Sequence, residues 1–225
     1  MDLAANLQSV REKMDQACDR AGRPPASVRL VAVTKGQPPE RVHQAMKLGL
    51  TLFGESRVQE AREKIGQCPG SADWHMIGHL QSNKCRDAIA LFSMIHSVDS
   101  AELAVELNRF AIKAAKTMPI LLEVNVAGES SKFGIKPEQI TEVAKKVNEL
   151  PKLMVHGLMT IAPYSVDPEK VRPCFKKLRE LKEACEQAIG GALPELSIGM
   201  SGDFQMAIEE GATLIRVGTT LFGPR

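Results

Sequence analysis

The chain has 225 residues, and its 29 lysine and arginine residues nearly balance its 27 aspartate and glutamate residues. This length suits one large domain or two small ones, and the alternation of strand and helix patterns leads us to expect a single α/β domain over residues 1–225. The balanced charge gives no reason to expect nucleic acid or an anionic membrane as a partner. No apolar run reaches the length that a membrane span requires.

The cysteines and the first residues indicate a cellular compartment. Five cysteines are an odd number, and none forms a C-x-x-C pair, so the sequence supports neither a disulfide framework nor a zinc knuckle. The opening segment MDLAANLQSVREK interrupts its apolar residues with polar ones and lacks a secretory core. We therefore expect a cytoplasmic protein with reduced thiols. His75 and His79 stand four residues apart without an H-E-x-x-H pattern, and we expect no metal site.

The predicted elements alternate along the chain. Apolar residues recur every three or four positions between residues 3 and 21, which predicts a first helix that ends near Gly22. Short apolar runs then predict strands at 28–34, 52–55, 74–78, 94–98, 119–126, 153–161, 195–200 and 213–218. Helical patterns begin near residues 38, 58, 87, 101, 137, 167 and 203.

Eight short strands separated mostly by helices predict a (β/α)₈ barrel preceded by an extra N-terminal helix. An open doubly wound sheet is the structural alternative, since eight parallel strands can also lie flat. The segment VTKGQPP after the first strand has no G-x-G-x-x-G turn, so the usual dinucleotide-binding form of that fold is not supported. We therefore favour the barrel.

Candidate site residues follow the strands whose ends form the reactive face of such a barrel. Lys35 ends the first run, and a desolvated lysine amine is a nucleophile toward aldehydes. Ser201 opens a short helix after the seventh run, and Gly218 and Thr219 follow the eighth. Their backbone N–H and hydroxyl groups suit a phosphate. Arg216, inside an apolar run, needs an acceptor or anionic partner if it points inward.

Each of these residues also has an ordinary explanation. A strand often ends in a charged residue, a serine often caps a helix, a glycine often begins a turn, and an arginine often forms an ion pair. Their combination at the expected phosphate end favours a lysine that holds a phosphate-bearing aldehyde cofactor.

Several long motifs, in this order, resemble those of the pyridoxal phosphate homeostasis proteins. The resemblance covers nearly the whole chain. The motifs are VAVTK ending at Lys35, FGESRVQE (53–60), WHMIGHLQSNK (74–84), HSVD (96–99), VNVAGESSKFG (124–134), HGLMTI (156–161) and LSIGMSGDFQMAIEEGATLIRVGTTLFG (196–223).

The resemblance implies a barrel similar to the alanine racemase N-terminal domain, with pyridoxal 5'-phosphate held as a Schiff base on Lys35. It also implies that Ser201, Gly218 and Thr219 hold the phosphate, and that Arg216 is the partner of the pyridine nitrogen. A cation at that nitrogen keeps it unprotonated and makes the ring a weak electron sink. The family usually reads FGEN where this chain reads FGES, so no cofactor role is assigned to Ser56.

By the same resemblance we expect a non-catalytic carrier that maintains intracellular pyridoxal phosphate, vitamin B6 and amino-acid pools and serves client enzymes. A weak amino-acid racemase that uses Lys35 is the alternative. Related racemases add a C-terminal β domain that supplies a tyrosine base and much of the dimer interface, whereas this sequence ends soon after the eighth run. Its single tyrosine, Tyr164, does not match that motif, and two-sided proton transfer needs a base on each face. We therefore assign no firm catalytic residue and expect a monomer or weak dimer.

Overall fold

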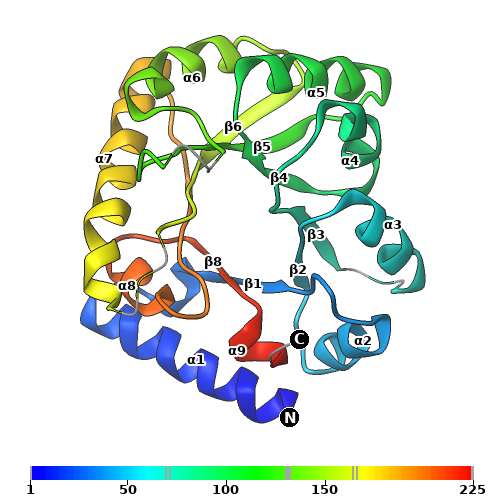
Figure 1. Ribbon diagram of the computed structural model, residues 1–225, viewed down its shortest axis with the longest axis vertical. Coiled ribbons are helices and arrows are strands. Elements are labelled where there is room, and N and C mark those ends of the chain that lie inside the picture. Colours follow the sequence, from blue (N-terminus) through cyan, green and yellow to red (C-terminus); the bar gives the residue numbers. More distant parts are fainter. Residues whose placement is uncertain are drawn as a thin grey trace.

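A computed structural model describes residues 2–68, 70, 72–129, 133–163, 165 and 167–223. The strands of this part of the chain close into one barrel in the order of the sequence, β1 to β8, and each pairs in parallel with its neighbours. Helices surround the strands (Figure 1). The predicted barrel is confirmed, and the open sheet is not formed.

The strands are β1 (Arg29–Val33), β2 (Leu52–Glu55), β3 (Asp73–Met76), β4 (Met94–Val98), β5 (Met118–Glu123), β6 (Leu153–Met159), β7 (Glu195–Ser197) and β8 (Leu214–Val217). The α-helices are α1 (Leu3–Arg20), α2 (Pro39–Lys47), α3 (Val58–Gln67), α4 (Cys85–Leu91), α5 (Ala101–Lys113), α6 (Ile140–Asn148), α7 (Arg172–Ile189), α8 (Phe204–Glu209) and α9 (Thr219–Phe222). Short 3₁₀ turns are η1 (Pro25–Ser27), η2 (Ser82–Lys84), η3 (Pro137–Gln139) and η4 (Pro168–Val171).

The predicted strands all form, and β2 and β4 have the predicted ends. Several others are shorter than their apolar runs, because the last residues of those runs leave the ladder and turn into the loops at the barrel mouth. Two helix starts differ as well, since the segments predicted as helix openings near residues 137 and 167 are 3₁₀ turns that lead into α6 and α7. The sequence patterns did not predict α9.

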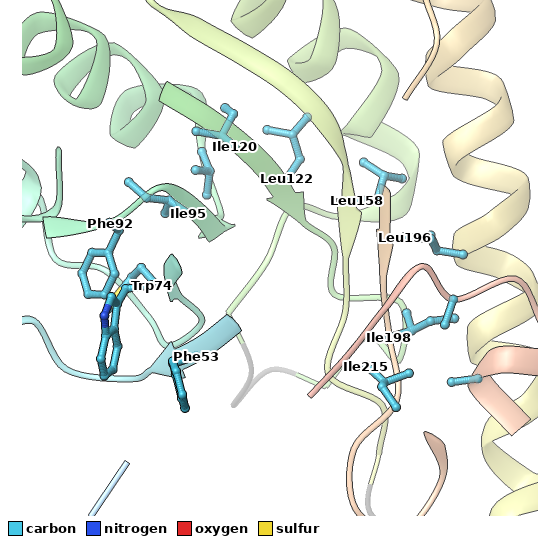
Figure 2. Close-up of a cluster of buried hydrophobic side chains, with 14 of the residues drawn as sticks. Phe53, Trp74, Phe92, Ile95, Ile120, Leu122, Leu158, Leu196, Ile198 and Ile215 are labelled. Atoms are coloured by element: carbon cyan, nitrogen blue, oxygen red, sulfur yellow. The ribbon is translucent and has the colours of Figure 1, made fainter. Parts of the chain in front are cut away.

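The core has two layers, because side chains alternate between the two faces of each strand. Figure 2 shows part of the outer layer, where strand residues such as Ile120, Leu122 and Leu158 are buried. This layer includes Phe53 and Trp74, whose rings stack with centroids 5.1 Å apart. The inner layer fills the barrel with residues from the alternate strand positions: Val31, Val33, Ile77, Met94, Leu121, Met159 and Leu214.

One glycine sets the approach of two strands. A side chain at Gly157 in β6 would meet the Glu195 carbonyl oxygen of β7 at 1.8 Å, so only glycine permits this spacing. At the same end of the barrel, Arg29 of β1 and Glu195 form an ion pair of 2.5 Å. The opposite end, where the strands finish, is the usual location of a ligand site in such barrels.

The predicted first helix, α1, packs against α8 and α9 (Figure 1). Its buried stripe includes Leu7, Val10 and Met14, and the side chain of Asp2 caps its first turn by accepting a hydrogen bond from the N–H of Ala4. This packing steadies the two short helices that follow β7 and β8. None of the helices in the described part of the chain combines the length and the apolar character of a membrane span.

Candidate functional site

One cavity of about 250 Å³ opens where the strands end. It brings together every predicted site residue: Lys35, Ser201, Arg216, Gly218 and Thr219. These residues are up to 184 positions apart, and the barrel closure between β1 and β8 unites them. The carboxyl ends of barrel strands are the usual location of a ligand site. Val33, Gln37, Ile77, Ile161, Met200, Gly202 and Gly223 complete the lining.

Lys35 enters this cavity because of the strand alternation that fills the barrel. Val31 and Val33 belong to the inner layer, and Lys35 is the next residue of that series. It follows the last residue of β1 by two positions, so its backbone already belongs to a loop, and its side chain is exposed to the cavity. An amine at this position can reach an aldehyde in the cavity.

Another part of the cavity wall consists of the segments after β7 and β8. They are joined by two hydrogen bonds of 3.3 Å, in which the N–H and the hydroxyl of Thr220 donate to the hydroxyl and the carbonyl oxygen of Ser201. Thr219 begins α9, so its N–H has no partner within that helix. A side chain at Gly218 would come within 3.3 Å of Val33. This wall offers hydroxyl and N–H donors to an anion.

Arg216 forms the base of the cavity, and only 5% of its surface is exposed. Its guanidinium donates to the carbonyl oxygen of Ser197 (2.8 Å), to the hydroxyl of Ser197 (2.6 Å) and to the carbonyl oxygen of Thr160 (2.9 Å). Among the described residues, no carboxylate lies at ion-pair distance from it. Burial lowers the pKa of Arg216 to about 10, so it stays a cation at neutral pH.

A chain of buried polar side chains continues from Arg216 into the barrel. The hydroxyl of Ser197 lies 3.0 Å from Nδ1 of His96, and Nε2 of His96 lies 2.9 Å from Nδ1 of His75. Burial lowers the pKa of His75 to about 3 and the pKa of His96 well below its usual value, so both rings are neutral at neutral pH. We call Arg216, Ser197, His96 and His75 the floor cluster.

Glu123, at the end of β5, is a buried carboxyl near this cluster. Burial raises its pKa to about 7, and the nearby charge of Asp99 adds to the rise while Arg216 opposes it. Burial also raises the pKa of Asp203, whose Oδ1 accepts a hydrogen bond of 2.6 Å from the N–H of Met200. At neutral pH Glu123 is therefore only partly ionised.

A second polar cluster lies behind Lys35, between the barrel and α3. Lys64 donates to the Thr34 carbonyl oxygen (2.6 Å), to Oε1 of Glu55 (2.6 Å) and to Oε1 of Glu60 (2.9 Å). The Thr34 hydroxyl also donates to Oε1 of Glu55 at 2.6 Å, and the Gly36 N–H donates to Oε1 of Glu60 at 2.5 Å. We call Thr34, Glu55, Glu60 and Lys64 the Lys64 network.

Neither cluster was predicted from the sequence. A signal for the floor cluster exists, because His75, His96 and Ser197 are polar residues inside apolar strand runs at the alternation of the inner layer. For the Lys64 network there is a weaker signal, since Lys64 and Glu60 are four positions apart on one helix and Glu55 ends the preceding strand. Neither pattern names the partner across the barrel.

Ser56 lies away from the main cavity. Ser56 lines a separate cavity of about 150 Å³ with His79 and Lys84, and it is not among the residues of the main cavity. Tyr164 lies outside the described residues.

Comparison with known proteins gives a consistent family. Residues 5–225 match the family model described as alanine racemase, N-terminal domain. The chain is 44% identical to the pyridoxal phosphate homeostasis protein of Aquifex aeolicus, over all of this chain and 99% of that protein. It is 39% identical to the protein of the same name in Pseudomonas aeruginosa, over 99% and 96% of the two chains.

Solved structures agree. The structure of PipY from Synechococcus elongatus with PLP bound has a TM-score of 0.86 and 36% identity, and the match covers 99% of this chain and 100% of that chain. An alanine racemase of Clostridium difficile has a TM-score of 0.78 at 15% identity, over all of this chain and 57% of that one, which shows likeness of fold alone. The chain belongs to the family of pyridoxal phosphate homeostasis proteins, whose barrel is that of the alanine racemase N-terminal domain.

Proposed function

We propose that this protein binds pyridoxal 5'-phosphate, with Nζ of Lys35 attached to the aldehyde carbon. The observation that carries the proposal is the joint lining of one cavity of about 250 Å³ by an amine, a wall of hydroxyl and N–H donors, and a buried cation. The PLP-bound structure of PipY supports the same ligand. Bound pyridoxal phosphate supplies an aldehyde that reacts with amines and a ring that accepts electrons.

The residues fit that ligand by their chemistry. A phosphate needs several donors and no opposing carboxylate, and Ser201, Gly218 and Thr219 meet this need on the wall formed by the segments after β7 and β8. The Arg216 guanidinium is a cation at the base of the cavity, and it would be the partner of the ring nitrogen. A neighbouring cation disfavours a proton on that nitrogen, and this limits the electron-accepting power of the ring.

That limit favours storage and delivery over conversion of amino acids. We therefore propose that the protein is a carrier that maintains the intracellular supply of pyridoxal phosphate, in keeping with the name of its relatives. We further propose a cytoplasmic location, pyridoxal-phosphate-dependent enzymes as recipients, and a monomer or weak dimer that light scattering can test. The likeness to alanine racemases concerns the fold alone, so racemase activity is not proposed.

The first experiment is the absorbance spectrum of the protein after incubation with pyridoxal phosphate, before and after borohydride reduction, followed by peptide mass mapping. We expect a visible band that reduction removes and a pyridoxyl group on Lys35. The variant Lys35→Ala should lose both, whereas Lys84→Ala, at the separate cavity that Ser56 lines, should keep both. A wild-type protein that stays colourless and unmodified would overturn the proposal.

A second experiment isolates the phosphate wall. In Thr219→Ala the hydroxyl donor is lost while Lys35 is untouched, so we expect faster loss of pyridoxal phosphate on dialysis with the reducible band retained. The matched experiment uses pyridoxal, which has no phosphate. Thr219→Ala should not change its retention. Equal retention of pyridoxal phosphate by the variant and the wild type would remove Thr219 from the phosphate site.

A further inference from the structure

The ammonium group of Lys64 is almost completely enclosed. Its side chain is 3% exposed, and the side chain of Glu55 beside it is fully buried. An ammonium group has three N–H donors, and those of Lys64 go to Thr34, Glu55 and Glu60. The group therefore has a single orientation, set by three acceptors from three different segments.

The network contacts both residues that flank Lys35 in the chain, Thr34 and Gly36. Thr34 precedes Lys35 and is held at three points: its N–H donates to the Gly54 carbonyl oxygen (3.1 Å), its hydroxyl donates to Glu55, and its carbonyl oxygen accepts from Lys64. Gly36 follows Lys35, and its N–H donates to Glu60. The network thus holds the backbone on both sides of Lys35.

The turn between these two anchors has a fixed shape. Gly36 has a φ of +71°, a conformation that favours glycine, and the Gln37 N–H closes the turn on the Thr34 carbonyl oxygen at 2.9 Å. That carbonyl oxygen also accepts from Lys64, so both of its lone pairs are used. A shift of Lys64 or Glu60 would change the direction in which the Lys35 side chain leaves the backbone.

Stability alone does not account for this arrangement. Burying Lys64 and Glu55 costs desolvation free energy, and apolar side chains of similar size often stabilise a core as well or better. One oxygen of Glu55, Oε2, is buried without a hydrogen-bond partner among the described residues. The unpaired oxygen means that the Lys64 network is poorly optimised for stability. The network nevertheless fixes the geometry of the turn that carries Lys35.

We propose that Lys64 is a positioning residue for Lys35: by joining Thr34, Glu55 and Glu60, it fixes the turn that directs the Lys35 amine into the cavity. This inference rests on the proposed attachment of pyridoxal phosphate to Lys35. Lys64 acts from behind β1 and does not line the cavity. Its effect is therefore on the rate and geometry of attachment rather than on direct contact with the ligand.

The test uses Lys64→Met and Glu60→Ala, with Lys182→Met as the matched control. Lys182 also pairs with a carboxylate four residues along its helix, Glu186 (2.7 Å), and with a backbone carbonyl, that of Leu193 (3.0 Å), but it does not approach β1. The side chain of Glu60 is 29% exposed, so Glu60→Ala should fold even if Lys64→Met does not. Glu60→Gln keeps an oxygen acceptor for the Gly36 N–H and serves as the rescue.

The first readout needs no cofactor. Hydrogen exchange at the Gly36 amide of the cofactor-free protein should be roughly ten-fold faster in Glu60→Ala, as expected for the loss of one hydrogen bond, and near the wild-type rate in Glu60→Gln. The second readout is attachment of pyridoxal phosphate, followed by absorbance. It should be roughly ten- to a hundred-fold slower in Lys64→Met and Glu60→Ala, with altered circular dichroism of the bound chromophore, and unchanged in Lys182→Met.

The outcomes separate the two proposals. A wild-type protein that never takes up pyridoxal phosphate would overturn the proposed function, and the exchange rates would still decide whether the network holds the turn. If the folded variants attach pyridoxal phosphate at the wild-type rate, the positioning role of Lys64 is overturned. This holds even if hydrogen exchange at the Gly36 amide becomes faster. The positioning role is supported if attachment is slow in Glu60→Ala, recovers in Glu60→Gln and is unchanged in Lys182→Met.

Discussion

The floor cluster and the Lys64 network both bury a cation, but they surround it with different partners. Arg216 is held by two carbonyl oxygens and a hydroxyl, and the histidines beyond that hydroxyl are neutral. Lys64 is held by two carboxylates and one carbonyl oxygen. Neutral partners satisfy hydrogen bonds without cancelling the charge, whereas carboxylates cancel it.

This difference separates two tasks at one site. The uncancelled charge of Arg216 faces the cavity, and in a buried setting a charge acts strongly on nearby groups of a ligand. The cancelled charge of Lys64 projects little field, so its contribution is the geometry of the loop that carries Lys35. A buried basic side chain thus acts through its charge in the floor cluster and through its hydrogen bonds in the Lys64 network.

The largest expected effect comes from breaking the Lys64 network on one side only. Lys64→Met leaves Glu55 buried without its cation, and we expect a loss of roughly 3 to 5 kcal/mol in the free energy of unfolding. Urea unfolding of the cofactor-free protein measures it. The double variant Lys64→Met, Glu55→Leu removes both charges and should recover most of that loss. A double variant as unstable as the single one would mean that the paired charges are needed for folding itself.

The second effect is the pH dependence that Glu123 gives to the free energy of unfolding. The usual carboxyl pKa is 4.5, and that of Glu123 is raised to about 7 by burial. Between these values the folded chain keeps a proton that the unfolded chain has lost, so the free energy of unfolding falls as pH rises. The loss from this group reaches roughly 3 kcal/mol above pH 7.

Glu123→Gln removes this titration. The free energy of unfolding of the variant, relative to that of the wild type, should therefore rise by roughly 3 kcal/mol between pH 4 and pH 8. Denaturant unfolding at several pH values gives both curves. His75 and His96, whose pKa values are lowered, act with the opposite sign in both proteins and cancel in the difference. Parallel curves would mean that Glu123 ionises normally.

Much of the fold could be predicted from the sequence because it depends on local patterns. The eight apolar runs and the helices between them require only periodicity and helix-ending residues such as Gly22 to be recognised. The ends of β6 and β7 could not be predicted, because the apolar runs continue past the last strand residue. Ile161 and Met200, in these extensions, line the cavity. Helix α9 was missed because four residues carry no periodic signal.

In the candidate site, too, local patterns could be predicted and long-range contacts could not. Lys35, Ser201, Arg216, Gly218 and Thr219 follow or end strands, and the rule that ligands meet the carboxyl ends of barrel strands brings them together. The partners of Arg216 could not be predicted, because Ser197 and Thr160 lie 19 and 56 positions away from it in the sequence. Contacts of that kind depend on register and barrel closure, which no local pattern encodes.

The smallest expected effect is at the link between Arg216 and the histidines. Ser197→Ala removes one hydroxyl and leaves Nδ1 of His96 without that partner, while Arg216 keeps the carbonyl oxygens of Ser197 and Thr160. We expect a loss of roughly 1 to 2 kcal/mol in the free energy of unfolding. Ser93→Ala, which removes a single hydroxyl bond to the Trp74 carbonyl oxygen at 3.2 Å, is the control and should lose less.

The same variant also tests whether the hydroxyl influences the charge that faces the cavity. Because Ser197 is neutral, its loss changes no charge, and the cation of Arg216 remains in place on its two carbonyl partners. The absorbance maximum of bound pyridoxal phosphate should then match that of the wild type, although the protein is less stable. A shifted maximum would show that the hydroxyl orients Arg216 as well as linking it to His96, and the contrast with the Lys64 network would narrow, since both clusters would then position a basic side chain.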